Sequence, residues 1–247
     1  MSDVIDCHCH LSFLEEDQAS QYISESPDHQ WLMGGYQPSE WEHQVALKKK
    51  FPKNVMTAYG LHPWYVKSDE FNLDLDLEAL KIWIDQSDWI GEVGLDFHGD
   101  ENSLKKELQI NVFEKQLELS GNKPFVFHFV QSHGKALEIL NNYSVKGFVH
   151  GFSGSIEVAE QYYDCGILLS FGPGILSENY KKARAALQEL PIESILLESD
   201  TPSHPVDDGH PVEILEKVYK EAASLRGIGI EELKVQVSEN FKALLST

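Results

Sequence analysis

Short apolar runs alternate with longer amphipathic segments along the chain, a pattern typical of an α/β fold. Eight of these runs have the length and composition of buried strands. They are Val4–His10, Trp31–Tyr36, Val55–Leu61, Trp89–Leu95, Pro124–Phe129, Val145–Phe152, Gly166–Phe171 and Ser194–Glu198. Eight strands alternating with helices are what a (β/α)8 TIM barrel requires.

The segments between the strands predict helices, because their apolar residues recur at helical spacing. Clear examples are Leu104, Leu108, Phe113 and Leu117, and then Ala136, Leu137, Ile139 and Leu140. Two further helices are expected after the last strand, over Val212–Ala223 and Ile230–Leu245. Residues 73–78 alternate Leu with Asp or Glu, and we interpret them as a loop entering a helix at Leu80–Ile84.

The position of the polar residues favours a closed barrel over an open sheet. Histidines and acidic residues stand at the carboxyl ends of many different strands. A barrel gathers those ends at one face, whereas an open sheet would spread them apart. The 247 residues contain no Pro/Gly/Ser-rich linker, so we expect one barrel domain over residues 1–247.

Charge and cysteine content restrict which substrates and which cellular compartment suit the protein. The formal net charge of −20 repels nucleic acid and anionic membranes at long range, so a phosphate-bearing substrate needs local positive charge, such as a metal ion. Three cysteines are too few for a disulfide framework and suit a reducing compartment. No apolar run is long enough to span a membrane and no signal peptide is evident, so we expect a cytoplasmic protein. We also expect a monomer.

The strongest candidate for chemistry is the segment Asp6-Cys7-His8-Cys9-His10 at the end of the first strand. Alternate strand residues share one face, so Asp6, His8 and His10 lie together and the two cysteines point the other way. Two imidazoles on one face can bind one metal ion. A cysteine-based zinc site is the alternative, but its further ligand would have to be the third, distant cysteine. We therefore expect Cys7 and Cys9 to pack as small apolar residues.

Four more strands end in residues suited to bind metal. Glu92 is a carboxylate in an apolar strand, where an unpaired charge would be costly. His128 and His150 each close an apolar strand, and Asp200 follows the eighth. Each alone has an ordinary structural explanation, such as a hydrogen-bonded histidine or a turn aspartate. Their matching positions favour a shared metal site.

Other polar residues carry weaker signals. His62 ends the third strand and is expected near the site, without necessarily binding metal. For Asp96, capping a loop is at least as good an interpretation as a role in the site. His98, His204 and His210 fall in loops at the same face, where contact with substrate and exposure to solvent are equally good readings. We expect surface positions for three further histidines, His29, His43 and His133.

In this order, the motifs resemble the TatD-type metal-dependent deoxyribonuclease family of the amidohydrolase-like superfamily. The matching pieces span nearly the whole chain. They are Asp6 to Leu11, Gly60 to Pro63, Gly91 to Asp96, Pro124 to His128, His150 to Gly154, and Glu198 to Pro202. The resemblance implies a (β/α)8 barrel with one or two divalent ions. It implies that His8, His10 and Asp200 hold the first ion, that Glu92 bridges, and that His128 and His150 complete the second.

Two departures from the family pattern lie near the expected substrate site. The family usually carries an arginine two places after the fifth-strand histidine, where this chain has Val130. It tends to carry Asn-Glu-Pro after the eighth strand, where this chain has Gly209-His210-Pro211. The metal residues match while the substrate residues differ, so hydrolysis is better supported than DNA as the substrate.

The sequence therefore predicts a divalent-metal-dependent hydrolase, a phosphodiesterase acting on DNA ends or short single-stranded DNA. Two ions, of Zn, Mn, Mg, Ni or Fe, lower the pKa of a water molecule, and Asp200 accepts its proton. The first alternative is an amide, lactone or small-phosphoester hydrolase using the same dinuclear site. The second is a non-catalytic scaffold that binds metal, which the retained buried charges disfavour.

Overall fold

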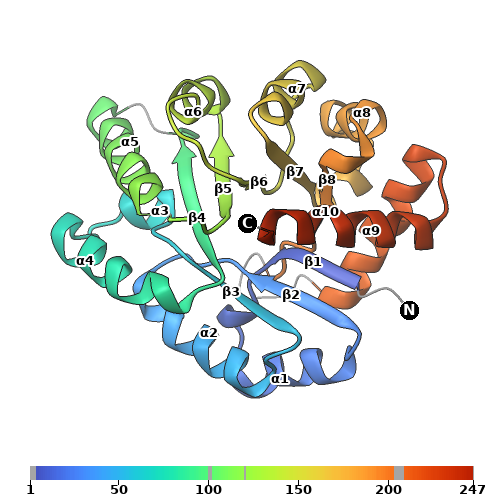
Figure 1. Ribbon diagram of the computed structural model, residues 1–247, viewed down its shortest axis with the longest axis horizontal. Coiled ribbons are helices and arrows are strands. Elements are labelled where there is room, and N and C mark those ends of the chain that lie inside the picture. The colour runs from blue at the N-terminus through green and yellow to red at the C-terminus, as the bar shows by residue number, and fades with distance from the viewer. Residues whose placement is uncertain (1–3, 100–101, 120, 203–208, 247) are drawn as a thin grey trace.

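A parallel sheet of eight strands in sequential order, β1 to β8, forms the centre of the computed structural model (Figure 1). The structure describes residues 4–99, 102–119, 121–202 and 209–246. The strands are β1 (Val4–Cys9), β2 (His29–Met33), β3 (Val55–Tyr59), β4 (Trp89–Asp96), β5 (Phe125–Val130), β6 (Gly147–Val149), β7 (Ile167–Phe171) and β8 (Ile195–Leu197). Each predicted strand is present, with ends that differ from the predicted bounds by a few residues.

Helices connect successive strands and surround the sheet, as Figure 1 shows. They are α1 (Glu16–Glu25), α2 (Pro38–Lys50), α3 (Pro63–Val66), α4 (Leu73–Trp83), α5 (Ser103–Glu118), α6 (His133–Leu140), α7 (Ile156–Asp164), α8 (Lys181–Glu189), α9 (Pro211–Arg226) and α10 (Ile230–Leu245). Parallel strands joined by helices make the (β/α)8 barrel that the sequence predicts. No helix in the described ranges is long and apolar enough to cross a membrane.

The first and last strands meet through the segments that follow them. The amide of Asp200 donates to the carbonyl of His8 at 3.0 Å, and the amide of His10 donates to the carbonyl of Thr201 at 2.9 Å. These bonds bring the barrel close to closure and place the ends of β1 and β8 side by side. The chemistry-bearing residues of both strands therefore share one end of the barrel.

The opposite end of the barrel is covered by α10, which crosses the centre of Figure 1. Phe241 stacks on Trp89, the first residue of β4, with ring centroids 4.9 Å apart. The Asn240 side chain donates to the carbonyls of Ile192 and Ile195 at the start of β8, at 2.7 and 2.8 Å. This cover closes the barrel bottom, so the open end is the one where the strands finish.

The prediction of a loop over residues 73–78 is wrong, because these residues form the first turns of α4. The Asn72 side chain accepts a hydrogen bond from the amide of Leu75, and Asp76 accepts one from the amide of Asn72, which is the reciprocal cap of a helix start. Leu77 and Leu80 are buried, while Leu75 is exposed. The strict alternation of Leu with acidic residues resembles a strand pattern, so the helical spacing of the buried residues was not recognised from the sequence.

Candidate metal centre

Strand β1 places two imidazoles together because alternate residues point to the same face. His8 is fully buried, and His10 follows directly after the strand. Their Nε2 atoms lie 3.2 Å apart. Asp6, on the same face, instead accepts hydrogen bonds from the amides of Ser199 at 2.9 Å and His8 at 3.3 Å. It thereby joins β1 to the segment after β8, and its burial raises its pKa to about 7.

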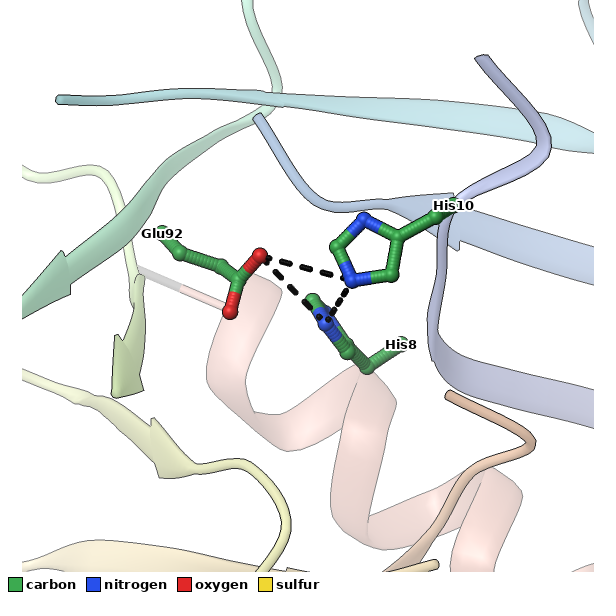
Figure 2. Close-up of side chains that lie close together, drawn as sticks. All are labelled: His8, His10 and Glu92. Carbon is green, nitrogen blue, oxygen red and sulfur yellow. Dashed lines mark hydrogen bonds and ion pairs between the residues drawn. The ribbon is translucent and has the colours of Figure 1, made fainter. Parts of the chain in front are cut away.

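Both imidazoles face Glu92 and Asp200, as Figure 2 shows for the first of these carboxylates. The Glu92 Oε1 atom lies 3.6 Å from Nε2 of each histidine. The Asp200 Oδ1 atom lies 3.7 Å from Nε2 of His8 and 3.5 Å from Nε2 of His10. A tetrahedral ion with bonds of about 2.0–2.1 Å separates its ligand atoms by about 3.3–3.4 Å. The spacing of the ligand atoms of His8, His10 and Glu92 therefore fits one divalent ion, and Asp200 lies beside both histidines.

The other carboxylate oxygen of Glu92 faces a second group. Oε2 lies 2.8 Å from Nε2 of His150 and 3.6 Å from Nδ1 of His128. Those two histidine nitrogens are 2.8 Å apart. Glu92 thus stands between two sets of nitrogen atoms, with one oxygen toward each. All six residues expected to bind metal come together at one end of the barrel.

Two further carboxylates stand behind the histidines of the second group. Asp96 Oδ2 lies 3.4 Å from Nε2 of His128. Glu198 Oε1 lies 3.7 Å from Nδ1 of His150 and accepts a hydrogen bond from the amide of Gly151 at 2.6 Å. A carboxylate behind a histidine fixes the orientation and tautomer of the ring. The role of Glu198 was not predicted from the sequence, although a carboxylate directly after an apolar strand was a usable signal.

Asp96 has both of the roles that the sequence left open, because it caps a loop and also contacts a histidine of the site. Its Oδ1 atom accepts a hydrogen bond from the amide of His98 at 2.8 Å, which caps the loop after β4. Its Oδ2 atom faces His128 and accepts a hydrogen bond from the indole of Trp64. These contacts outweigh the effect of burial and hold the pKa of Asp96 below its usual value.

The charge states of the cluster follow from burial and from the close carboxylates. Burial lowers the pKa of His8 to about 3, so its ring is neutral and can bind a cation. Burial raises the pKa of Glu92, but the neighbouring histidines, His8 first, lower it more, and the carboxylate stays ionised. His150 differs: burial lowers its pKa, but Glu92 and Glu198 raise it well above the usual value.

His62 lies beside the second group, as the sequence predicts. Its Nδ1 atom accepts a hydrogen bond from the amide of Trp64 at 3.1 Å, and its Nε2 atom lies 3.8 Å from Oε2 of Glu92. Burial, followed by the charge of His128, keeps the pKa of His62 well below its usual value. The neutral ring therefore carries its proton on Nε2, which points toward the cluster.

The cluster forms the floor of a cavity of about 600 Å³, a size typical of small-molecule sites. The lining residues are His10, Ser12, Phe13, Tyr36, Gln37, Glu40, His62, Trp64, Glu92, His128, His150 and Asp200. This set contains no lysine or arginine among the described residues. Positive charge for an anionic substrate must therefore come from the metal-binding groups.

The remaining candidate histidines are not in this cavity. His98 is exposed and pairs with Gln131 at 2.8 Å, and His210 packs against Tyr22 with its Nε2 atom 3.7 Å from Glu25. His204 lies outside the described residues.

Three histidines expected at the surface, His29, His43 and His133, are each partly exposed and partly buried. His43 contacts the carbonyl of Ser12 at 2.8 Å, and His133 contacts the hydroxyl of Tyr162 at 3.1 Å. His29 stacks on Trp31. By contrast, Cys7 and Cys9 are buried apolar residues, as expected.

Comparison with known proteins agrees with this geometry. The family described as TatD related DNase matches residues 5–246. An uncharacterized metal-dependent hydrolase of Haemophilus influenzae is 30% identical over 254 residues, covering 95% of this chain and 96% of that protein. The crystal structure of YjjV, a TatD homolog from Escherichia coli K12, has a TM-score of 0.86 and 26% identity, covering 98% of this chain and 97% of that one.

A more distant structure shares the fold. The hydrolase TatD family protein from Entamoeba histolytica has a TM-score of 0.81 at 19% identity, covering 98% of both chains. The family match over nearly the whole chain, together with the metal-binding geometry at the open end of the barrel, leads to one conclusion. The chain belongs to the TatD family of metal-dependent hydrolases.

Proposed function

We propose that this protein hydrolyses phosphodiester bonds at the ends of DNA or in short single-stranded DNA, with two divalent ions bound per chain. The family supports hydrolysis, and the cavity supports a small substrate segment. The observation that carries the proposal is the position of Glu92, whose Oε1 atom faces His8 and His10 and whose Oε2 atom faces His128 and His150. A carboxylate in that position is suited to bridge two ions.

The six clustered residues divide into two sets in this proposal. His8, His10 and Asp200 would hold the first ion, and His128 and His150 would hold the second, with Glu92 available to both. When bound, such ions make a water molecule more acidic and offset negative charge that develops on a phosphate group. Histidine and carboxylate ligands suit Zn, Mn, Ni or Fe, and also Mg where water completes its coordination.

The protein groups then handle the proton and the substrate. Asp200 is ionised, because its contact with His10 and the charge of His150 outweigh burial and lower its pKa. It accepts a proton from the attacking water and returns it to the oxygen of the leaving nucleoside, so water and the phosphodiester yield an alcohol and a phosphomonoester. The Nε2 proton of His62 is placed to donate to a phosphate oxygen.

The second candidate is hydrolysis of an amide, a lactone or a small phosphoester by the same residues. One observation favours it, namely that no lysine or arginine lines the cavity in the described part of the chain. Val130 ends β5 where the family pattern usually has an arginine. A neutral or singly charged substrate would need no such side chain. The third candidate, a scaffold without activity, would not require the buried charges of the cluster to be retained.

One assay separates these candidates. Metal-loaded protein is incubated with short single-stranded DNA, with a simple aromatic phosphodiester, and with a panel of amides and lactones. The Asp200→Asn variant serves as the control for contaminating nuclease. Cleavage of DNA and of the phosphodiester that falls about 100-fold or more in the control supports the proposal. Turnover of amides or lactones alone supports the second candidate, and no turnover of any substrate supports the scaffold.

The setting and assembly of the protein are also part of the proposal. We propose that residues 1–247 form one hydrolase domain that works as a monomer in the cytoplasm. All three cysteines are free thiols, which suits a reducing compartment. Sedimentation of the purified chain at several concentrations would reveal any larger assembly.

A further inference from the structure

Three aromatic side chains line the cavity beside the metal-binding groups, and we call them the aromatic wall. Phe13, Tyr36 and Trp64 come from the segments that follow β1, β2 and β3. Trp64 is 47% exposed, which is unusual for so large an apolar ring. Apolar surface exposed beside a reactive centre is typical of a ligand-binding site.

The aromatic wall begins at the cluster itself. Phe13 stacks on His10 with ring centroids 4.7 Å apart and an angle of 10° between the planes. Tyr36 stacks on His62 with centroids 5.0 Å apart. A flat group bound against this wall would therefore belong to the nucleotide whose phosphate lies at the metal centre.

The charge of the cavity makes stacking the main source of binding energy for this nucleotide. With no lysine or arginine in the described lining, few contacts reach phosphates beyond the one at the metal centre. Stacking of one base on an aromatic side chain strengthens binding by about 5- to 150-fold and requires no cation. The wall can thus hold a base, but stacking alone does not distinguish one base from another.

Glu40, near the start of α2, lines the same cavity and can supply that distinction. Its Oε2 atom accepts a hydrogen bond from the amide of Tyr36 at 3.2 Å, a role explained by helix capping. No lysine, arginine or histidine of the described chain forms an ion pair with Glu40. Burial raises the pKa of Glu40 to about 7, so its carboxylate is fully ionised only above neutral pH.

We propose that the wall of Phe13, Tyr36 and Trp64 binds one nucleobase of the substrate, and that Glu40 selects bases with an exocyclic amino group. This inference rests on the proposed phosphodiesterase function. The amino groups of cytosine, adenine and guanine donate to a carboxylate. Thymine presents carbonyl oxygens on both sides of its single N–H group, and these oxygens repel a carboxylate. The site should therefore disfavour thymine.

The test compares cleavage of short single-stranded oligo-dC and oligo-dT by the metal-loaded protein at a pH well above 7, where the Glu40 carboxylate is ionised. One hydrogen bond to a charged acceptor corresponds to a preference of about tenfold or more for oligo-dC. The Glu40→Gln variant should lose this preference, because its amide can both donate and accept. The matched control is Glu42→Gln on the same helix, which is exposed and should keep the preference.

A second variant separates stacking from selection. Phe13→Leu should slow cleavage of both oligonucleotides by a similar factor of about tenfold, because stacking acts on every base. A third measurement needs no variant: dCMP should inhibit the unmodified protein at about tenfold lower concentration than dTMP. This comparison keeps the test decisive if Glu40→Gln fails to fold.

Equal cleavage of oligo-dC and oligo-dT by the unmodified protein would overturn the inference and leave the phosphodiesterase proposal in place. A preference for oligo-dC that persists in a folded Glu40→Gln variant would also overturn it. No cleavage of either oligonucleotide by fully metallated protein would refute the phosphodiesterase proposal itself, and the base selection with it.

Discussion

Replacing Gly34 by alanine should disable the metal centre without unfolding the barrel. Gly34 follows β2 and lies directly against the cluster. A Cβ atom at this position would lie 2.3 Å from Cε1 of His8 and 3.0 Å from Oε1 of Glu92. Contacts between carbon atoms become repulsive below about 3.5 Å, so the His8 ring would have to retreat by about 1 Å.

The His8 ring has no free space into which to move. It is fully buried, and it lies 4.2 Å from the ring of His150 and 4.7 Å from that of His10, centroid to centroid. A displacement of about 1 Å in a catalytic constellation lowers the rate about 100-fold. Overpacking in a buried position costs about 1–3 kcal/mol of stability. For a chain of this length, the Tm falls by about 2–4 °C for each kcal/mol.

The assay combines metal content by mass spectrometry, thermal unfolding and turnover of a phosphodiester. Gly134→Ala is the matched control, because a Cβ atom there meets no atom within 4 Å and the residue lies in α6. The control should keep wild-type metal content and turnover. Gly34→Ala should bind metal weakly and turn over about 100-fold more slowly while remaining folded. Wild-type affinity and turnover in Gly34→Ala would refute the placement of His8 and Glu92 as ligands.

Three further predictions concern protons and phosphate. Asp200→Asn should keep part of the metal but lower turnover about 100-fold or more, as measured with fully metallated protein; near wild-type rates would limit Asp200 to a ligand. His150 has a raised pKa in the metal-free cluster, so an ion must displace its proton. Metal affinity should therefore rise with pH toward that pKa, and calorimetry in two buffers should detect proton release at neutral pH; a pH-independent affinity would contradict this. DNA binding should be weak with a shallow salt slope, and Val130→Arg should steepen it by about one unit.

The sequence predicts most of the barrel because buried parallel strands produce continuous apolar runs. It also locates His8, His10, Glu92, His128 and Asp200, since a polar residue at the end of an apolar strand requires a partner. The loop expected at residues 73–78 shows the limit of this reasoning. Alternation of Leu with acidic residues imitates a strand, and the cap formed by Asn72 and Asp76 depends on side-chain geometry that a pattern does not express.

The supporting residues were harder to predict than the cluster itself. Glu198 and Asp96 act through histidines that are distant in the sequence, so only the closed barrel brings each pair together. Glu40 lies within an ordinary amphipathic helix, and nothing in its sequence neighbourhood separates it from the exposed Glu42. Its place in the cavity follows from the direction in which α2 leaves the barrel.

The central claim is that hydrolysis depends on two ions held by this cluster. The most direct test is a titration of metal-stripped protein with a divalent ion, in which bound metal and phosphodiester turnover are measured on the same samples. We predict no turnover without metal and full turnover at two ions per chain. Full turnover in the presence of excess chelator, or a plateau that is independent of bound metal, would contradict the account.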